Sequence, residues 1–187
     1  MAIVHIPTKN IRITEPVDLG ENLGRIGIDY AKWENLKQVS ADASDEEILD
    51  AYADEIDVLK RKGGYVTADV INIVPTTPGL DAMLAKFNKE HWHDEDEIRF
   101  IVKGRGLFHI APESGDVVSI EMEAGDLIRV PRGMKHWFNL CGERTVRAIR
   151  LFQDTSGWTP HYSGSGVDGG YQPLCFGALY IPPAGER

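Results

Sequence analysis

The chain contains little cysteine and no long apolar segment. Its two cysteines, Cys141 and Cys175, are far apart and lack the paired spacing of zinc-thiolate or redox motifs. We therefore expect two reduced, largely buried thiols, with a disulfide as the alternative. No stretch approaches the ~20 consecutive apolar residues of a membrane helix. The start, Met1–Ile6, lacks the regions of a signal peptide, so a cytoplasmic protein without membrane contact is expected.

Basic residues are also in the minority. The 20 lysines and arginines are outnumbered by 29 aspartates and glutamates, which gives a formal net charge of -9. An acidic surface repels nucleic acids and anionic membranes, so we expect neither as a partner. An anionic small molecule would need a local positive site. The 187 residues suit a single domain.

The first third of the chain, residues 1–86, has a mixed α/β pattern. Ser44 and Glu47 have the spacing of a capping box, and an apolar stripe with period 3.6 follows them. The basic residues 60–62 and Gly63-Gly64 suit the end of that helix. The pattern thus predicts a helix over residues 45–62, a strand over Val66–Val74 and a shorter helix over Leu80–Phe87.

From residue 97 onwards, short apolar or alternating runs are separated by turn residues such as Gly104-Arg105-Gly106. The runs predict strands over Glu97–Lys103, Leu107–Ala111, Val117–Glu121, Leu127–Val130, His136–Leu140 and Val146–Phe152. Such even spacing favours an antiparallel sandwich or barrel. A loop is expected over Ser163–Gly170, and one more strand over Leu174–Ile181.

Three histidines and one glutamate have the spacing of a metal site. His91 and His93 are two residues apart, and residues i and i+2 of an extended chain point to the same side. Glu97 has the same parity, and a bend over residues 91–95 would bring all three side chains around one point. His136 follows the turn at Pro131–Gly133 and begins a predicted strand, so it is expected to face inward.

Three imidazoles and a carboxylate form a mixed nitrogen and oxygen donor set. This set suits iron, nickel, manganese, cobalt or zinc better than calcium or magnesium. A six-coordinate ion would keep two positions for a bidentate oxygen ligand. His5, His109 and His161 have no potential ligands at such spacing around them and are expected to be ordinary core or surface residues.

Two segments resemble the paired motifs of the cupin family. They are His91-x-His93-x3-Glu97-x6-Gly104 and Gly125-x5-Pro131-x-Gly133-x2-His136. Within that family, Glu90–Phe100, Pro131–Phe138 and Ile149–Phe152 resemble acireductone dioxygenases, most strongly from 87 to 158. The resemblance implies a mainly β fold, a double-stranded β-helix or jelly-roll barrel. It implies one cupin domain, 1–187, with a mixed α/β region (1–86), a metal-binding barrel core (87–158) and a loop with a final strand (159–187).

The resemblance also implies an activity, a metal-dependent dioxygenase of methionine salvage. Its substrates would be O2 and the acireductone 1,2-dihydroxy-3-keto-5-methylthiopentene. With Fe2+ the products would be 4-methylthio-2-oxobutanoate and formate. With Ni2+ they would be 3-methylthiopropanoate, formate and carbon monoxide. One ion per chain is expected, and a monomer is expected because apolar strands can close a barrel on themselves.

The family's site residues map onto single positions of this chain. The metal ligands would be His91, His93, Glu97 and His136, and Arg99 would favour the substrate dianion. A bare ion pair of Arg99 with Glu97 or Glu95 is the alternative. Glu90 and Asp96 match positions tied to metal loading and to relaying local shape changes. The residues expected to line the pocket are Phe87, Phe138, Arg150 and Trp158.

Two other functions remain open from the residues alone. Another cupin dioxygenase or a sugar isomerase would share the metal set, but a phosphosugar would need more cationic residues than Arg99 and Arg150. A non-catalytic cupin that binds a metal or small molecule is the alternative from a different class. Such proteins often duplicate the barrel or carry a DNA-binding helix pair, and this sequence shows neither.

Overall fold

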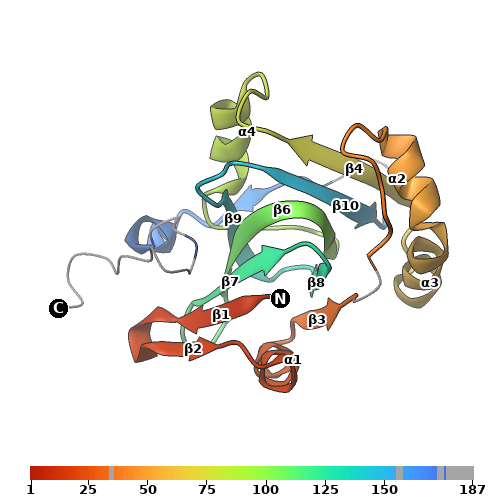
Figure 1. Cartoon of the computed structure of the whole chain (residues 1–187). Helices are drawn as coiled ribbons and strands as arrows, with labels where there is room; N and C mark the ends of the chain where they lie inside the picture. The colour runs from red at the N-terminus through yellow and green to blue at the C-terminus, as the bar shows by residue number, and fades with distance from the viewer. Residues whose placement is uncertain (34–35, 155–157, 172–174, 176–187) are drawn as a thin grey trace.

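Two antiparallel sheets share one long strand, β6 (Glu97–Ala111), in this computed structural model (Figure 1). The structure describes residues 1–33, 36–154, 158–171 and 175. The first half of β6 pairs with β8 and β10, and its second half pairs with β7 and β9. A mainly β barrel fold, as expected, is confirmed.

The first sheet has the order β4-β10-β6-β8-β3, and the second has the order β11-β5-β9-β6-β7-β1-β2. The strands of the first sheet besides β6 are β3 (Asp29–Lys32), β4 (Thr67–Ile73), β8 (Asp126–Val130) and β10 (Val146–Phe152). Those of the second are β1 (Ile3–Ile6), β2 (Ile11–Ile13), β5 (His91–Trp92), β7 (Val118–Glu123), β9 (Lys135–Leu140) and β11 (His161–Tyr162).

Helices lie around the barrel (Figure 1). The α-helices are α1 (Pro16–Arg25), α2 (Asp45–Ala51), α3 (Ala53–Gly63) and α4 (Leu80–Phe87), and two short 3-10 turns, η1 and η2, cover Pro7–Lys9 and Val167–Gly170. Ser44 and Glu47 form the predicted capping box at the start of α2. None of the helices in the described residues is long and apolar enough to cross a membrane.

The side chains of β6 change sides along the strand. Ile98 and Phe100 face the helices, so Glu97, Arg99 and Ile101 face the barrel interior. Beyond Gly104 the even-numbered residues Phe108 and Ile110 face the interior instead. The change coincides with a register shift opposite β10 and with the positive φ of Gly104. The strand therefore bends from one sheet into the other without a turn.

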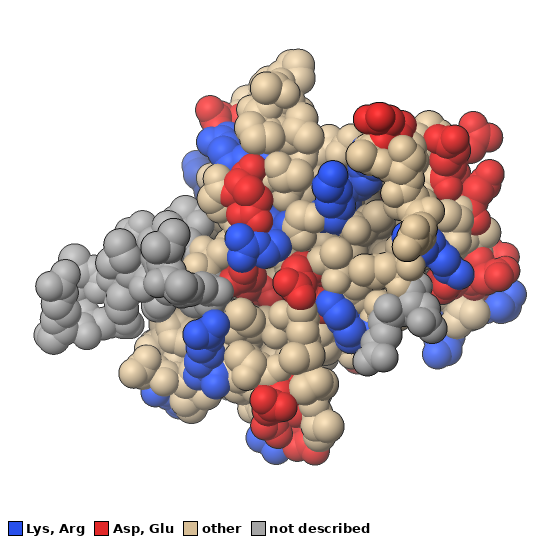
Figure 2. Space-filling model, viewed as in Figure 1, with Lys and Arg blue, Asp and Glu red and all other residues tan. Residues whose placement is uncertain are grey.

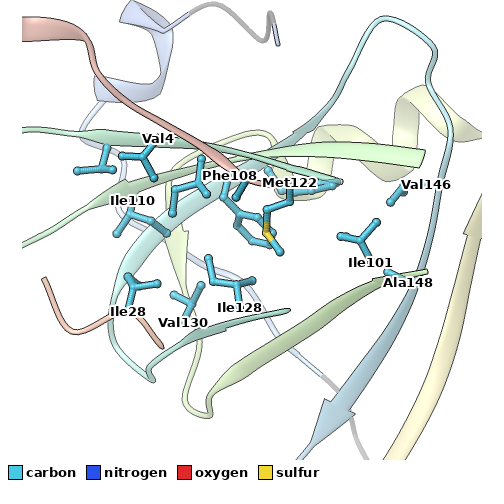
Figure 3. Packing of buried hydrophobic residues seen from close by; sticks show 14 of the residues in the cluster. Val4, Ile28, Ile101, Phe108, Ile110, Met122, Ile128, Val130, Val146 and Ala148 are labelled. Carbon is cyan, nitrogen blue, oxygen red and sulfur yellow. The ribbon is translucent and has the colours of Figure 1, made fainter. Parts of the chain in front are cut away.

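Two apolar cores result from this alternation. The larger lies inside the barrel and joins residues of both sheets, such as Ile101, Phe108 and Ile128 (Figure 3). The second lies between the outer face of the first sheet and helices α2 and α3, where Ile48, Tyr52 and Phe100 pack together. This second core covers the outer face of the first sheet and so keeps water away from the strands that carry Glu97.

Several predictions are confirmed and others are wrong. The strand Val146–Phe152, the helix Leu80–Phe87 and a strand within Val66–Val74 form as predicted. The turn at Gly104-Arg105-Gly106 is wrong, because these residues lie inside β6. The single helix over 45–62 is also wrong, because it breaks at Tyr52 into α2 and α3. The loop expected over Ser163–Gly170 contains the turn η2, and the strand expected over Leu174–Ile181 lies outside the described residues.

The expectation of two reduced thiols is wrong. Cys141 and Cys175 form a disulfide, with their Cα atoms 5.3 Å apart. The fold brings the residue after β9 next to the C-terminal segment, although 34 positions separate the two cysteines in the sequence. Local spacing carries no information about such a long-range approach, which is why the sequence favoured free thiols.

Candidate metal centre

Three strands and one bend position the predicted metal ligands. His91 lies on β5, directly paired with His136 on β9, and Glu97 begins β6. His93 follows β5 in the bend, as expected. The backbone carbonyl of His93 accepts a hydrogen bond from Gly133 N–H at 2.9 Å, which ties the bend to the turn before β9.

The four side chains meet inside the barrel. One nitrogen from each of His91, His93 and His136 lies within 4.8 Å of the others, so these three histidines can hold a metal ion. Glu97 Oε2 lies 3.1 Å from His136 Nε2 and 3.3 Å from His93 Nε2. Each of the four residues is at most 3% exposed. The cluster is therefore screened from water.

Backbone carbonyls determine which nitrogen of each imidazole faces the cluster. The Nδ1 atoms of His91 and His136 lie 2.6 and 2.8 Å from the carbonyl oxygens of Lys89 and Met134, and His93 Nδ1 lies 2.9 Å from that of Thr159. A carbonyl only accepts, so each Nδ1 carries a proton and donates it. In the neutral rings the Nε2 lone pairs then point inward, and the buried Nε2 of His91 has no hydrogen-bond partner.

Such an arrangement calls for a cation. Lone pairs of three imidazoles and an anionic oxygen repel one another at these distances unless a positive charge lies among them. Burial alone would raise the pKa of Glu97, but the positive charge of Arg99 outweighs this effect and holds the pKa well below its usual range. Burial lowers the pKa of His91 to about 4, so this ring stays neutral. The residues therefore fit a divalent transition metal.

Arg99 lies beside the cluster and is itself buried. Its Nη2 is 2.8 Å from Glu97 Oε1. Arg99 therefore forms the ion pair with Glu97 that was predicted as one alternative. Its guanidinium carbon lies 4.4 Å from the ring centre of Phe138, 5.2 Å from that of Phe108 and 5.7 Å from that of Trp158. Aromatic faces stabilise a cation in a dry site. A fixed positive charge thus stands next to the metal position.

Aromatic rings surround this group. Trp158 stacks over His93 with 6.0 Å between ring centres, and its indole N–H donates to the carbonyl of Asp96. The ring centre of Phe87, the last residue of α4, lies 5.8 Å from that of His91. Phe138 lies on β9 two residues after His136, on the same face of the strand. The structure thus brings these three predicted pocket residues to the cluster.

Other predicted residues lie further out. Arg150 pairs in register with Arg99, but its guanidinium binds both carboxylate oxygens of Asp69, at 2.8 and 2.6 Å. The Asp96 carboxylate accepts hydrogen bonds from Arg129, Tyr65 and the backbone N–H of Arg132. The side chains of Arg150 and Asp96 thus bind residues outside the cluster.

Sequence reasoning missed the residues that close the site from the C-terminal side. Thr159 supplies the carbonyl that orients His93, and the hydroxyls of Ser163 and Ser165 donate hydrogen bonds to the buried carboxylate of Glu90. No motif marks these residues, because a backbone carbonyl has no sequence signature and serines are common in loops. His5 and His109 are buried and His161 is partly exposed, in line with the ordinary roles expected for them.

A β-barrel with three histidines and a glutamate converging inside it defines a metal-binding cupin. The chain matches the model of the ARD/ARD′ family over residues 10–160 and belongs to that family. The curated acireductone dioxygenase of Picosynechococcus is 44% identical over 162 residues, which cover 87% of this chain and 92% of the relative. That of Bacillus cereus strain ZK is 39% identical over 87% of this chain and its own full length.

A solved structure agrees with these relatives. The acireductone dioxygenase of Bacillus anthracis, described with a cadmium ion in its active centre, superposes with a TM-score of 0.80. It is 39% identical to this chain, and the match covers 87% of this chain and 98% of the other. The family thus includes a member that holds a divalent cation at its active centre.

Proposed function

We propose that the protein is an acireductone dioxygenase of methionine salvage that uses one Fe2+ or Ni2+ per chain. The observation that carries the proposal is the buried cluster in which three inward imidazole lone pairs converge with the Glu97 carboxylate. His91, His93, His136 and Glu97 would be the ligands. A divalent ion held there would supply a Lewis-acidic centre that binds the two oxygens of an enediol.

Arg99 would balance the charge of the bound substrate. A divalent ion and one carboxylate leave a net charge of about +1, whereas an enediolate dianion brings two negative charges. The buried guanidinium lies close enough to Glu97 to act on the same position, and it stays protonated at physiological pH. It would therefore favour the second ionisation of the substrate.

The aromatic residues would keep the reacting groups dry and aligned. Phe138 and Trp158 contact Arg99, and Phe87 lies against His91. We assign these three to the substrate pocket, with Arg150 at its edge beside Trp158. Orientation and charge complementarity then supply the catalysis without a protein nucleophile. Glu90 and Asp96 would hold the segments on either side of the ligands.

Metal content and turnover test the ligand assignment together. We expect His93→Ala and Glu97→Gln to lose most of the bound iron or nickel and most of the acireductone-dependent oxygen uptake. Glu143→Gln is the matched control, because Glu143 is exposed and its carboxylate pairs with Arg105 rather than with a residue of the cluster. Full oxygen uptake by a metal-free His93→Ala protein would overturn the proposal.

Substrate choice separates this activity from other cupin reactions. Oxygen uptake should be much faster with an acireductone than with other enediols or thiols. Formate should accompany both metal forms, and carbon monoxide only the nickel form. Tight metal binding without oxygen uptake on any enediol would favour a non-catalytic cupin instead.

We also propose that the protein acts as a monomer in the cytoplasm. On the face drawn in Figure 2, acidic and basic side chains are interspersed, and acidic groups gather near α2 and α3. Like charges on two copies would oppose their association there. Sedimentation should give a single species near 20.8 kDa, and a larger species that persists on dilution would contradict the monomer.

A further inference from the structure

The described residues 158–171, here called the C-terminal strap, pass along the metal-binding end of the barrel. The strap forms β11, which pairs with β5 so that Tyr162 lies opposite His91. It also supplies the Thr159 carbonyl to His93 and the indole of Trp158 that stacks on the same ring. The orientation of two of the metal-binding histidines therefore depends on where the strap lies.

Polar contacts fasten the strap to the residues around the cluster. Ser163 N–H donates to the carbonyl of Glu90, and the hydroxyls of Ser163 and Ser165 donate to its buried carboxylate. Tyr162 donates to the carbonyl of Lys86 at the end of α4. All residues of the strap, Trp158 included, are half-buried or exposed, and none belongs to either apolar core. Hydrogen bonds rather than hydrophobic burial thus hold the strap, which makes it a low-stability element.

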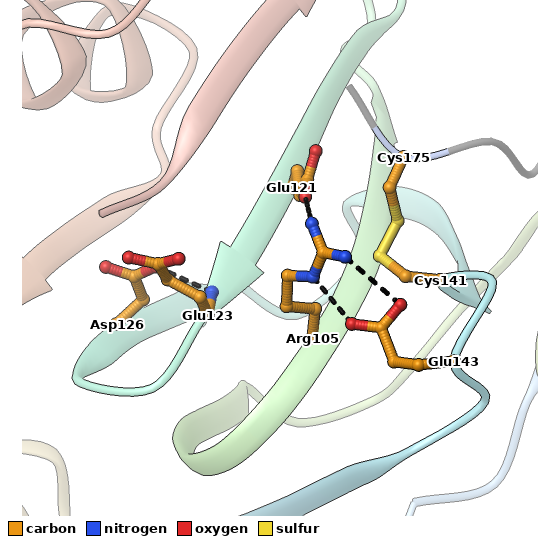
Figure 4. The surroundings of a disulfide bond; sticks show 7 residues. All are labelled: Arg105, Glu121, Glu123, Asp126, Cys141, Glu143 and Cys175. Atoms are coloured by element: carbon orange, nitrogen blue, oxygen red, sulfur yellow. Dashed lines mark hydrogen bonds and ion pairs between the residues drawn. A yellow bond between two sulfur atoms is a disulfide. The ribbon is translucent and has the colours of Figure 1, made fainter. Parts of the chain in front are cut away.

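The strap then follows the outer face of β9. Tyr171 packs edge-on against Trp137 of β9 and His109 of β6, with ring centres 5.6 and 5.7 Å apart. Four residues further on, Cys175 is bonded to Cys141, the residue that directly follows β9 (Figure 4). The disulfide therefore fastens the chain beyond the strap to the strand that carries His136.

The surroundings of the disulfide make one sulfur the point of attack. Cys141 is 1% exposed, whereas Cys175 is only partly buried. Arg105 lies nearby and binds the carboxylates of Glu121 and Glu143 (Figure 4). An incoming thiolate can reach Cys175 Sγ first, with Cys141 as the leaving group.

We propose that the Cys141–Cys175 disulfide is a thiol–disulfide exchange site that controls how firmly the C-terminal strap is held over the metal centre. A dithiol reductant attacks Cys175 Sγ, and the Cys141 thiolate leaves and takes up a proton. The second thiol of the reductant then closes its own disulfide and releases the Cys175 thiolate. Two electrons pass from the dithiol to the cystine, and a disulfide oxidant reverses the reaction.

Reduction removes the covalent end of the strap but leaves its hydrogen bonds. The strap then opens more often, and each opening takes Thr159 and Trp158 away from His93. The effect on metal binding rests on the proposed metal site, whereas the effect on the mobility of the strap does not. The oxidised form should keep its metal longer than the reduced form.

Hydrogen exchange measures the strap directly. Wild-type protein is compared as oxidised and as phosphine-reduced, with the reductant removed under argon and the thiols titrated after unfolding. We expect no free thiols in the oxidised form and two in the reduced form. The strap amides should exchange at least about tenfold faster after reduction. Amides in the end turns of α1 exchange by local fraying, independently of global unfolding, and α1 lies apart from the strap (Figure 1). They serve as the internal reference and should not change. Equal exchange of the strap in both forms, or an equal increase in α1, would overturn the proposal.

Metal retention gives the second readout. The nickel-loaded protein is mixed with excess chelator, and we expect release about tenfold faster from the reduced form. The double variant Cys141→Ser/Cys175→Ser should release metal at the reduced rate with or without the phosphine, which also controls for direct effects of the reductant. Release that is independent of redox state would contradict the inference. Failure of the acireductone assay alone would refute the proposed function and leave both readouts unaffected.

Discussion

At the scale of single residues, parity along an extended chain identifies most of the metal centre. His91, His93 and Glu97 have the spacing that brings side chains to one side, and the structure places them together with His136. Parity could not identify the partners that orient the rings, because these partners are backbone carbonyls of Lys89, Thr159 and Met134. The contacts of Arg150 with Asp69 also needed the register of β4 against β10.

Removal of the Arg99 charge should alter the pH dependence of turnover. In Arg99→Met the guanidinium no longer favours the substrate dianion, so the acid limb of kcat/KM should move to higher pH by about one unit or more. Arg99→Lys keeps the charge without the planar stacking against Phe138 and should fall between the two. An acid limb that stays in place in Arg99→Met would exclude this role, provided that metal content is unchanged.

His109 should make the folded protein sensitive to acid. Burial lowers its pKa to about 3, whereas an unfolded chain binds the proton near pH 6.5. Stability from this residue is therefore complete above about pH 6.5 and falls as the pH drops towards 3, by up to about 1.4 kcal/mol per pH unit. The loss between pH 7 and pH 5 should be smaller by about 2 kcal/mol in His109→Phe. Urea unfolding at both pH values measures it, and parallel profiles would refute the assignment.

At the scale of elements, the sequence predicted regular segments better than their junctions. The strand Val146–Phe152 and the helix Leu80–Phe87 have clear periodicity and clear ends, and both form as predicted. Gly104-Arg105-Gly106 has the composition of a turn, but neighbours on both sides keep the chain extended, so that it bends inside β6. The short strands β1, β2 and β3 pair with one another or with partners about 100 residues away, which no local pattern reveals.

Substitution at this bend should be costly. Gly104 has a φ of 79°, and an added Cβ would lie 2.1 Å from the carbonyl oxygen of Thr145. We expect Gly104→Ala to lower the free energy of unfolding by about 3 kcal/mol. Gly115→Ala is the matched control, because its φ is also positive but a Cβ would meet nothing within 4 Å. Equal losses in the two variants, measured by urea unfolding, would show that backbone strain alone matters.

At the scale of the whole molecule, the barrel could be predicted and the way the chain ends are fastened could not. Evenly spaced strands favoured a closed antiparallel fold, which the two sheets around β6 confirm. The division of the chain as one domain stays a prediction. The disulfide was missed because it joins segments that meet only after β9 and the C-terminal strap have folded.

The disulfide should stabilise the whole fold as well as the strap. It closes a loop between positions 34 residues apart, and loop-closure entropy predicts a contribution of about 4 kcal/mol. Urea unfolding of the oxidised wild type and of Cys141→Ser/Cys175→Ser should differ by roughly this amount. Reduction should bring the wild type to the value of the variant. A variant as stable as the oxidised protein would show that the bond leaves the unfolded chain unconstrained.

The choice of ring tautomer in this barrel is independent of side-chain identity outside the four ligands. Lys89, Met134 and Thr159 contribute only their peptide oxygens, so another residue at these three positions could accept the same protons if the backbone path is kept. Substitutions at positions 89, 134 and 159 should therefore still leave Nε2 as the histidine nitrogen that faces the metal ion. Retuning that nitrogen's basicity would instead require a shift of the main chain itself, which a single exchange of residues rarely produces.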